Sequence, residues 1–146
     1  MLGKSYLVVA NQSEAKIFIE SDNATSLEPV VVLINDDGRE HDSDLVTDRP
    51  GATAPPGSNG HGTNTFSRKD AAQIEADRFA NTVTDWLDKR RSAEKIYHIN
   101  IIAEAGFLGK LRNHMSKHVA DLVNKTVNKD VVREDEQVWL DYIRQA

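Results

Sequence analysis

Three segments of the chain hold polar side chains whose types and spacing could do chemistry. The first is Asp48-Arg49-Pro50-Gly51. Pro50 biases Arg49 towards an extended backbone, and Pro50-Gly51 suits a type II turn. Arg49 could then pair with Asp44 or Asp48 and hold the loop, or bind an external phosphate through two parallel hydrogen bonds. The candidate binding residues of this segment are Asp44, Asp48, Arg49, Pro50 and Gly51.

The second segment is the glycine-rich run Gly60-His61-Gly62. Glycine gives this run wide backbone freedom, so His61 could reach a partner. A histidine can act as a general base near neutral pH, but no serine or acidic relay is visible beside this one. We therefore keep Gly60, His61 and Gly62 as candidate binding residues, not as catalytic ones.

The third segment is Phe107-Leu108-Gly109-Lys110-Leu111-Arg112, which follows a predicted strand. Ligands of α/β sheets often bind beyond the carboxyl ends of strands. A helix start with two cations close by could hold an anion there. The alternative is that Phe107 belongs to the core and that Lys110 and Arg112 are simply solvated. The candidate binding residues are Phe107, Gly109, Lys110 and Arg112.

The remaining polar residues do not have the spacing of a metal centre. Asp42, Asp44 and Asp48 do not fit an EF-hand loop. His114 and His118 are four residues apart, but no HExxH motif surrounds them. The first predicted strand lacks the acid that a two-metal nuclease needs, and the chain contains no cysteine. The sequence therefore predicts no metal and no cofactor, and it favours binding over catalysis.

Hydrophobic periodicity indicates the elements that must position these segments. Short apolar runs rich in β-branched residues predict strands, and apolar steps of three and four predict helices. The predicted strands are 6–10, 15–20, 30–34, 96–103 and 122–127. The predicted helices are one of about six turns from 67, then 107–115, a short turn at 116–121, and 133–145. This order predicts an α/β fold with a mixed five-stranded sheet and helices on its faces. It matches the ribonuclease-H-like fold, and this analogy implies the strand order 3-2-1-4-5.

Length and composition fit one domain over residues 1–146. Residues 37–66 combine proline and glycine with few apolar side chains, which predicts a long flexible loop. The first apolar run is too short for a secretion signal, and no stretch is long enough to span a bilayer. We expect a cytoplasmic protein without a membrane segment, and the sequence does not set its oligomeric state.

The net charge of −5 is distributed unevenly along the chain. From residue 14 to residue 48, ten acids face only Lys16 and Arg39. From residue 105 to residue 129, only Asp121 opposes five bases, which are Lys110, Arg112, Lys117, Lys125 and Lys129. Such a distribution could steer an anionic partner to the basic side. The alternative is an ordinary solvated surface.

Several segments resemble the bacterial host-attachment protein family. They are 8–11, 14–18, 75–80, 107–112 and, most specifically, Asp44-Leu45-Val46-Thr47-Asp48-Arg49-Pro50-Gly51. That family is named for a requirement in attachment to host cells. It is distantly similar to the middle domain of archaeal and eukaryotic class-one peptide release factors, which carry a Gly-Gly-Gln loop. The corresponding position here holds Asn59-Gly60-His61-Gly62, without glutamine.

The resemblance implies a non-catalytic binding protein whose partner is RNA, the ribosome or another protein. Two alternatives stay open. One is a release-factor-like translation or ribosome-rescue factor that acts on peptidyl-tRNA through His61. The other is a metal-dependent hydrolase that uses the Asp48–Gly51 region.

Overall fold

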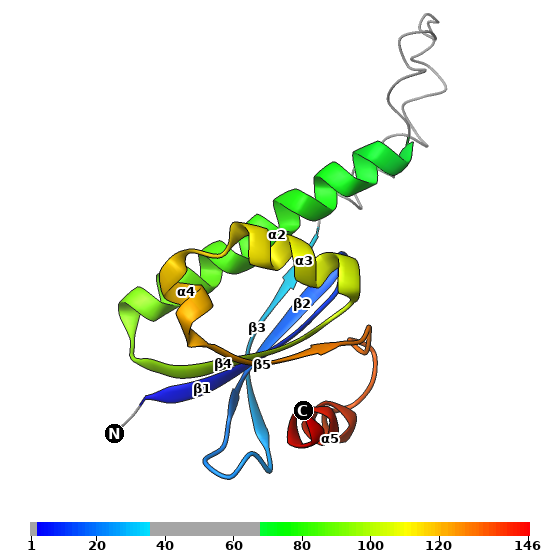
Figure 1. Ribbon diagram of the computed structural model, residues 1–146. Coiled ribbons are helices and arrows are strands. Elements are labelled where there is room, and N and C mark those ends of the chain that lie inside the picture. Colours follow the sequence, from blue (N-terminus) through cyan, green and yellow to red (C-terminus); the bar gives the residue numbers. More distant parts are fainter. Residues whose placement is uncertain (1–2, 36–67) are drawn as a thin grey trace, which may run out of the picture.

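The computed structural model describes residues 3–35 and 68–146 (Figure 1). In chain order its elements are β1 (Lys4–Ala10), β2 (Glu14–Glu20), β3 (Leu27–Ile34), α2 (Arg68–Ala93), β4 (Ile96–Ala103), α3 (Ala105–His114), α4 (Lys117–Leu122), β5 (Val123–Asn128) and α5 (Glu136–Gln145). The predicted flexible loop at 37–66 lies outside the described residues. Among the described residues, no helix is both long and apolar enough to cross a lipid bilayer.

The five strands form one mixed sheet in the order β3-β2-β1-β4-β5, which confirms the predicted order. β1, β2 and β3 pair antiparallel because short turns join them. β4, which follows α2, pairs parallel with β1, and β5, which follows β4 through α3 and α4, pairs parallel with β4. β1 is therefore the central strand, with an antiparallel neighbour on one side and a parallel neighbour on the other.

The two faces of the sheet are covered by different helices (Figure 1). α2, α3 and α4 pack over one face, where Phe79 of α2 stacks on Phe107 of α3 with 5.7 Å between ring centroids. α5 packs on the other face, where Trp139 and Ile143 join the core cluster formed by Leu7, Val9 and Ile102. Because side chains alternate along a strand, each strand contributes to both clusters.

Two helices begin two or three residues away from their predicted starts. α3 begins at Ala105, two residues early, because Glu104 caps it. α5 begins at Glu136, three residues late, because the side chain of Asp135 accepts from the backbone N–H of Val138 and forms the N-cap. The predicted first turn of α5, residues 133–135, is therefore wrong.

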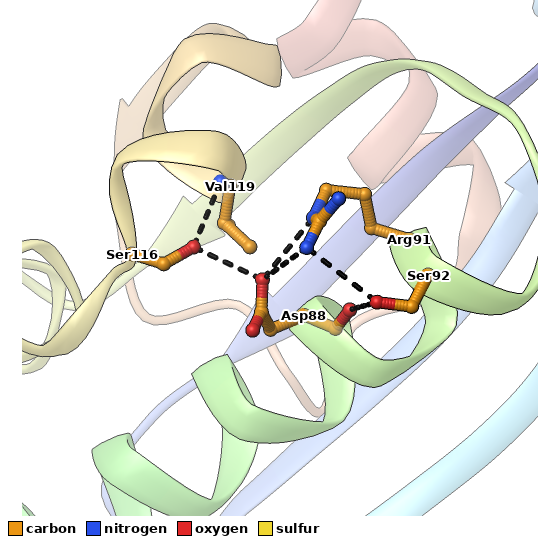
Figure 2. A network of polar contacts seen from close by, with 5 residues as sticks. All are labelled: Asp88, Arg91, Ser92, Ser116 and Val119. Atoms are coloured by element: carbon orange, nitrogen blue, oxygen red, sulfur yellow. Dashed lines mark hydrogen bonds and ion pairs between the residues drawn. The ribbon is translucent and has the colours of Figure 1, made fainter.

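A polar network fixes α4 to α2 (Figure 2). Ser116 Oγ donates to Asp88 Oδ1 at 3.0 Å and accepts from the backbone N–H of Val119 at 3.1 Å. Arg91 Nη2 lies 3.1 Å from the same Asp88 oxygen. The hydrogen bond from Ser116, followed by the one from Arg91, lowers the pKa of Asp88. One hydroxyl therefore both caps α4 and ties that helix to α2.

A second network holds the start of β1 to the end of α2. The fully buried Tyr6 donates its hydroxyl hydrogen to Glu94 and accepts from Arg90 Nε at 3.0 Å. Burial, then the hydrogen bond to Glu94, raises the pKa of Tyr6, and the same hydrogen bond lowers the pKa of Glu94. Lys4 Nζ lies 3.7 Å from Glu94 and completes the network.

Candidate functional site

The carboxyl ends of the three parallel strands meet at one end of the sheet. Ala10 of β1 lies beside Ala103 of β4, which lies beside Asn128 of β5. This is the place where α/β proteins usually bind ligands. The polar side chains just beyond these strands are those of Asn11 after β1, Glu104 after β4, and Lys129 and Asp130 after β5.

The side chain of Asn11 forms hydrogen bonds with other groups of this chain. Its Oδ1 accepts from the backbone N–H groups of Ser13 at 2.8 Å and Glu14 at 3.0 Å, which shapes the turn between β1 and β2. Its Nδ2 donates to Asp130 Oδ1 at 3.1 Å. The amide therefore joins two loops at this end of the sheet and has a structural role.

The side chain of Glu104 also forms hydrogen bonds within the chain. Its carboxylate accepts from the backbone N–H groups of Gly106 at 2.9 Å and Phe107 at 3.1 Å, which makes it the N-cap of α3. The helix start that could have held an external anion already faces a carboxylate. Any anion held by the 107–112 segment must therefore depend on Lys110 and Arg112. Glu104 stands between a strand and a helix, a position that could have marked it as the cap from sequence.

The four predicted binding residues of α3 do not share one environment. Phe107 is 1% exposed and belongs to the core. Gly109 is exposed, and an added Cβ would meet no atom within 4 Å. Lys110 is half-buried and Arg112 is exposed. A partner can therefore contact Gly109, Lys110 and Arg112. Phe107 is buried and packs in the core, so a partner cannot reach it.

Arg112 connects α3 with β5, since its Nη2 donates to Thr126 Oγ1 at 3.1 Å. We group Gly109, Lys110 and Arg112 of α3 with Thr126 of β5 and Lys129, the residue after β5, under the name α3–β5 edge. In the part of the chain that the structure describes, Lys110, Arg112 and Lys129 form no ion pair. Their charges remain available to an anionic group.

The other two cations of the basic stretch are used within the protein. Lys117 pairs with Asp121 at 3.4 Å. Lys125 Nζ donates to the carbonyl of Ile143 at 3.0 Å, at the C-terminal end of α5, where a cation is favoured. Of the five bases in the stretch 105–129, three therefore have neither an ion pair nor a backbone carbonyl as partner among the described residues, and they are Lys110, Arg112 and Lys129 of the α3–β5 edge.

The histidines of the described region have separate environments. His114 Nε2 lies 3.0 Å from Asp77 Oδ1, which joins α3 to α2, and His98 lies on the sheet against Tyr97. Over residues 3–35 and 68–146, no three His, Cys, Asp or Glu side chains gather closely enough to hold a metal ion.

Eight predicted binding residues fall outside the described part of the chain. They are Asp44, Asp48, Arg49, Pro50, Gly51, Gly60, His61 and Gly62. The hypotheses that concern them, which include the phosphate-binding turn and the histidine loop, stay predictions.

The sequence reasoning missed a polar set on the sheet. Asn100 of β4 is only 5% exposed; its Nδ2 donates to Glu20 Oε2 at 2.8 Å, and its Oδ1 accepts from the backbone N–H of Lys125 at 3.1 Å. Within β4, His98 and Asn100 alternate with the buried residues Ile99 and Ile101. That alternation could have shown that β4 has one polar face near its start.

Comparisons with known proteins identify a family. The chain matches the family model described as "Protein required for attachment to host cells" over residues 6–141. No curated protein matches it. Among solved structures it is similar to the type II variant of the Ppx/GppA phosphatase of Aquifex aeolicus, at 9% sequence identity and a TM-score of 0.38. That match covers 86% of this chain and 35% of the phosphatase chain, so this chain spans about a third of the phosphatase. Because the family model covers nearly its whole length, the chain belongs to the family of proteins required for attachment to host cells.

Proposed function

We propose that this member of the host attachment family works inside the cell as a non-catalytic binding protein, and that its α3–β5 edge contacts RNA, either free or within the ribosome. The observation that carries the proposal is the set of three cations, Lys110, Arg112 and Lys129, that form no ion pair within the described residues. Phosphate groups are the natural partners of such cations.

The geometry of the edge supports a backbone contact with the nucleic acid. The hydrogen bond to Thr126 holds one nitrogen of Arg112, so the guanidinium is oriented and can offer its remaining donors to a phosphate. Lys110 lies on the same helix, next to Gly109. The open space at Gly109 lets a chain of phosphates approach the helix closely between the two cations.

The polar groups at the strand ends support binding over catalysis. Asn11 and Glu104 stand where an α/β enzyme commonly places its reactive groups, yet both are engaged with the backbone of this chain. Neither is therefore a ready acid, base or metal ligand in the described part of the protein.

The test is the binding of a fluorescent single-stranded RNA 20-mer, followed by anisotropy over a range of salt concentrations. For single strands, the steepness of log K against log salt decreases by about 0.7 for each phosphate group that the protein ceases to neutralise. We expect the double variant Lys110→Glu plus Arg112→Glu to lower both the affinity and this steepness. Co-sedimentation with purified ribosomes should weaken in the same variant and with added salt.

The matched control is Lys89→Glu plus Lys117→Glu. It changes the net charge equally, but these lysines already pair with Asp85 and Asp121. An equal loss of binding in both variants would mean that only total charge matters, and it would contradict the proposed edge. If neither RNA nor ribosomes bind the unaltered protein, the proposal is wrong and an affinity pull-down should be used to find a protein partner.

A further inference from the structure

A polar patch lies on the sheet face opposite the α3–β5 edge. Leu7, Ile102 and Phe18 pack towards α5. Ser5, Asn100 and Glu20 lie two residues away from them on the same strands, so they share that face, and His98 follows from the same alternation. Ser5 lies directly beside Glu20 on one side and beside His98 on the other. We name Ser5, Glu20, Tyr97, His98 and Asn100 the Glu20 patch.

The patch remains partly open to solvent. Parallel strands are normally covered on both faces. Here α5 lies below the part of the sheet near β5, away from the N-terminal start of β1 (Figure 1). Ser5, Glu20 and His98 accordingly keep part of their surface exposed. The central strands β1 and β4 thus present polar residues on a face that α5 only partly covers.

The carboxylate of Glu20 is held in position without being neutralised. The buried amide of Asn100 donates to Glu20 Oε2 at 2.8 Å and draws the side chain across β1 towards β4. The other side of that amide is fixed by the N–H of Lys125. Within the described residues Glu20 forms no ion pair. The result is an oriented anionic acceptor whose charge has no cationic partner there.

An aromatic surface accompanies this carboxylate. The register between β1 and β4 shifts at Lys4 and Ser5, so that Tyr97 is an extra residue in β4. Such bulges redirect side chains. The Tyr97 ring lies on the His98 ring, with 3.9 Å between centroids and 27° between planes, and Tyr97 is 42% exposed. His98 in turn lies across Ser5 from Glu20, so the aromatic pair and the carboxylate belong to one strip of three neighbouring strands.

From this geometry we propose that the Glu20 patch binds an arginine side chain presented by a protein partner. A guanidinium group is planar, so it can stack on an aromatic ring, and its N–H groups form a fork that matches a carboxylate. It would lie against Tyr97 and donate to Glu20, while Ser5 can accept a further hydrogen bond. Its charge would complete the ion pair that Glu20 lacks within the described residues.

The local charge favours arginine over a nucleotide, which is also flat. The turn that follows Glu20, residues 21–26, adds Asp22 and no cation. Lys4 is held on the other side of β1 by Glu94, and Lys125 is held by the carbonyl of Ile143. A phosphate would meet the negative charges of Glu20 and Asp22, whereas a guanidinium would be attracted by them.

The test is an NMR titration of the full chain with the peptide acetyl-Gly-Gly-Arg-Gly-Gly-amide. Matched peptides carry lysine or citrulline in place of arginine, and adenosine monophosphate is a fourth probe. We expect the arginine peptide to shift the resonances of Tyr97, His98 and the Asn100 side chain in a saturable way. Citrulline has the shape without the charge, so its peptide should bind roughly tenfold more weakly.

Two variants locate the site and one controls for charge. Glu20→Gln keeps an oxygen for Asn100 and should preserve the fold while reducing affinity roughly tenfold. Tyr97→Ala should reduce it severalfold by removing the stacking surface. Glu28→Gln is the control, because Glu28 is exposed and its strand partner Ile19 packs on the opposite face. That variant should bind like the unaltered protein.

Three outcomes would overturn the inference. One is the absence of saturable shifts from the arginine peptide. Another is equal binding of the citrulline peptide, which would show that Glu20 contributes no charge. The third is tighter binding of adenosine monophosphate at the same resonances, which would identify the patch as a nucleotide site. None of these results bears on the α3–β5 edge, which lies on the other face.

Discussion

Asn100 and Glu20 are 80 residues apart in the chain, and the amide of one donates to the carboxylate of the other at 2.8 Å across the central strand. Asn100 is a buried polar residue in a sheet whose other central positions are mostly apolar. Its two hydrogen bonds join β4 to β2 and to β5, which are strands that do not touch one another. The amide is therefore part of both the stability of the sheet and the shape of the Glu20 patch.

Replacement of the Asn100 side chain should destabilise the folded protein. In Asn100→Ala, the backbone N–H of Lys125 and the Glu20 carboxylate both lose a partner, so we expect a loss of about 1–3 kcal/mol in the free energy of unfolding. Urea denaturation measures this loss. Asn113→Ala, at an exposed helical position, is the control and should change stability little. A loss below about 0.5 kcal/mol, the range of an ordinary surface substitution, would show that water replaces the amide at no cost.

Ser116→Ala should destabilise the protein by about 1 kcal/mol at pH 7, because the hydroxyl caps α4 and also donates to Asp88. The lowered pKa of Asp88 sets the pH dependence. The contribution of ionised Asp88 to the stability of the folded protein is present above the ordinary aspartate pKa of about 3.9. It is lost as the pH falls through the lowered pKa. The difference in the free energy of unfolding between the unaltered protein and Ser116→Ala should therefore become smaller below about pH 4. Ser92→Ala, at the margin of the network in Figure 2, should have a smaller effect at pH 7.

Tyr6→Phe removes the hydroxyl between Glu94 and Arg90. Because the pKa of Tyr6 is raised in the folded protein, its contribution to stability is present below the ordinary tyrosine pKa of about 10 and is lost as the pH rises through the higher value. The unaltered protein should lose this contribution above about pH 10, whereas the variant cannot. Urea unfolding at a series of alkaline pH values compares them, and parallel curves would contradict the role given to the hydroxyl.

Glu104→Ala should loosen the first turn of α3. The backbone N–H groups of Gly106 and Phe107 lose their acceptor, so their hydrogen exchange should become faster and the protein should lose about 1 kcal/mol of stability. Glu134→Ala is a suitable control, since Glu134 is exposed and does not cap a helix. Unchanged exchange at Gly106 and Phe107 would show that the carboxylate is dispensable and that the helix start is open to an external anion.

Gly109→Ala should raise the stability. Gly109 lies in the middle of α3, its phi angle is not positive, and an added Cβ meets open space, so the usual cost of a helical glycine, about 1 kcal/mol, is recovered. Thermal unfolding measures the gain. A loss of stability would mean that the helix needs glycine for a reason internal to the protein.

Much of the fold could be predicted from local patterns. Apolar runs separated by short turns indicated the antiparallel strands, and the stripe that includes Phe79, Val83 and Leu87 indicated α2. The start of α5 could not be predicted this way, because several neighbouring acids could begin a helix. Val132 sets the start of α5, because its side chain is buried in the core while its backbone lies in a turn. That turn is closed by the hydrogen bond from the Glu134 N–H to the Val131 carbonyl.

The candidate sites were less accessible to sequence reasoning. Lys110 and Arg112 were found because the basic stretch is continuous in sequence. The Glu20 patch was missed because its members come from three strands, and only the register shows that Ser5 lies between Glu20 and His98. The bulge that places Tyr97 against His98 leaves no signal in the spacing of apolar residues. Contacts of this kind depend on long-range pairing, which a single sequence does not specify.

The position of β1 also has a kinetic consequence. Its contacts with β2 join residues close in the chain, so that hairpin can form within microseconds. Its contacts with β4 join residues about ninety apart, as in the pairing of Lys4 with Ile96, and these close the longest loop of the sheet. Mixed topologies of this type fold more slowly than helical bundles. The docking of β4 beside a preformed hairpin should therefore limit the rate at which the native protein appears.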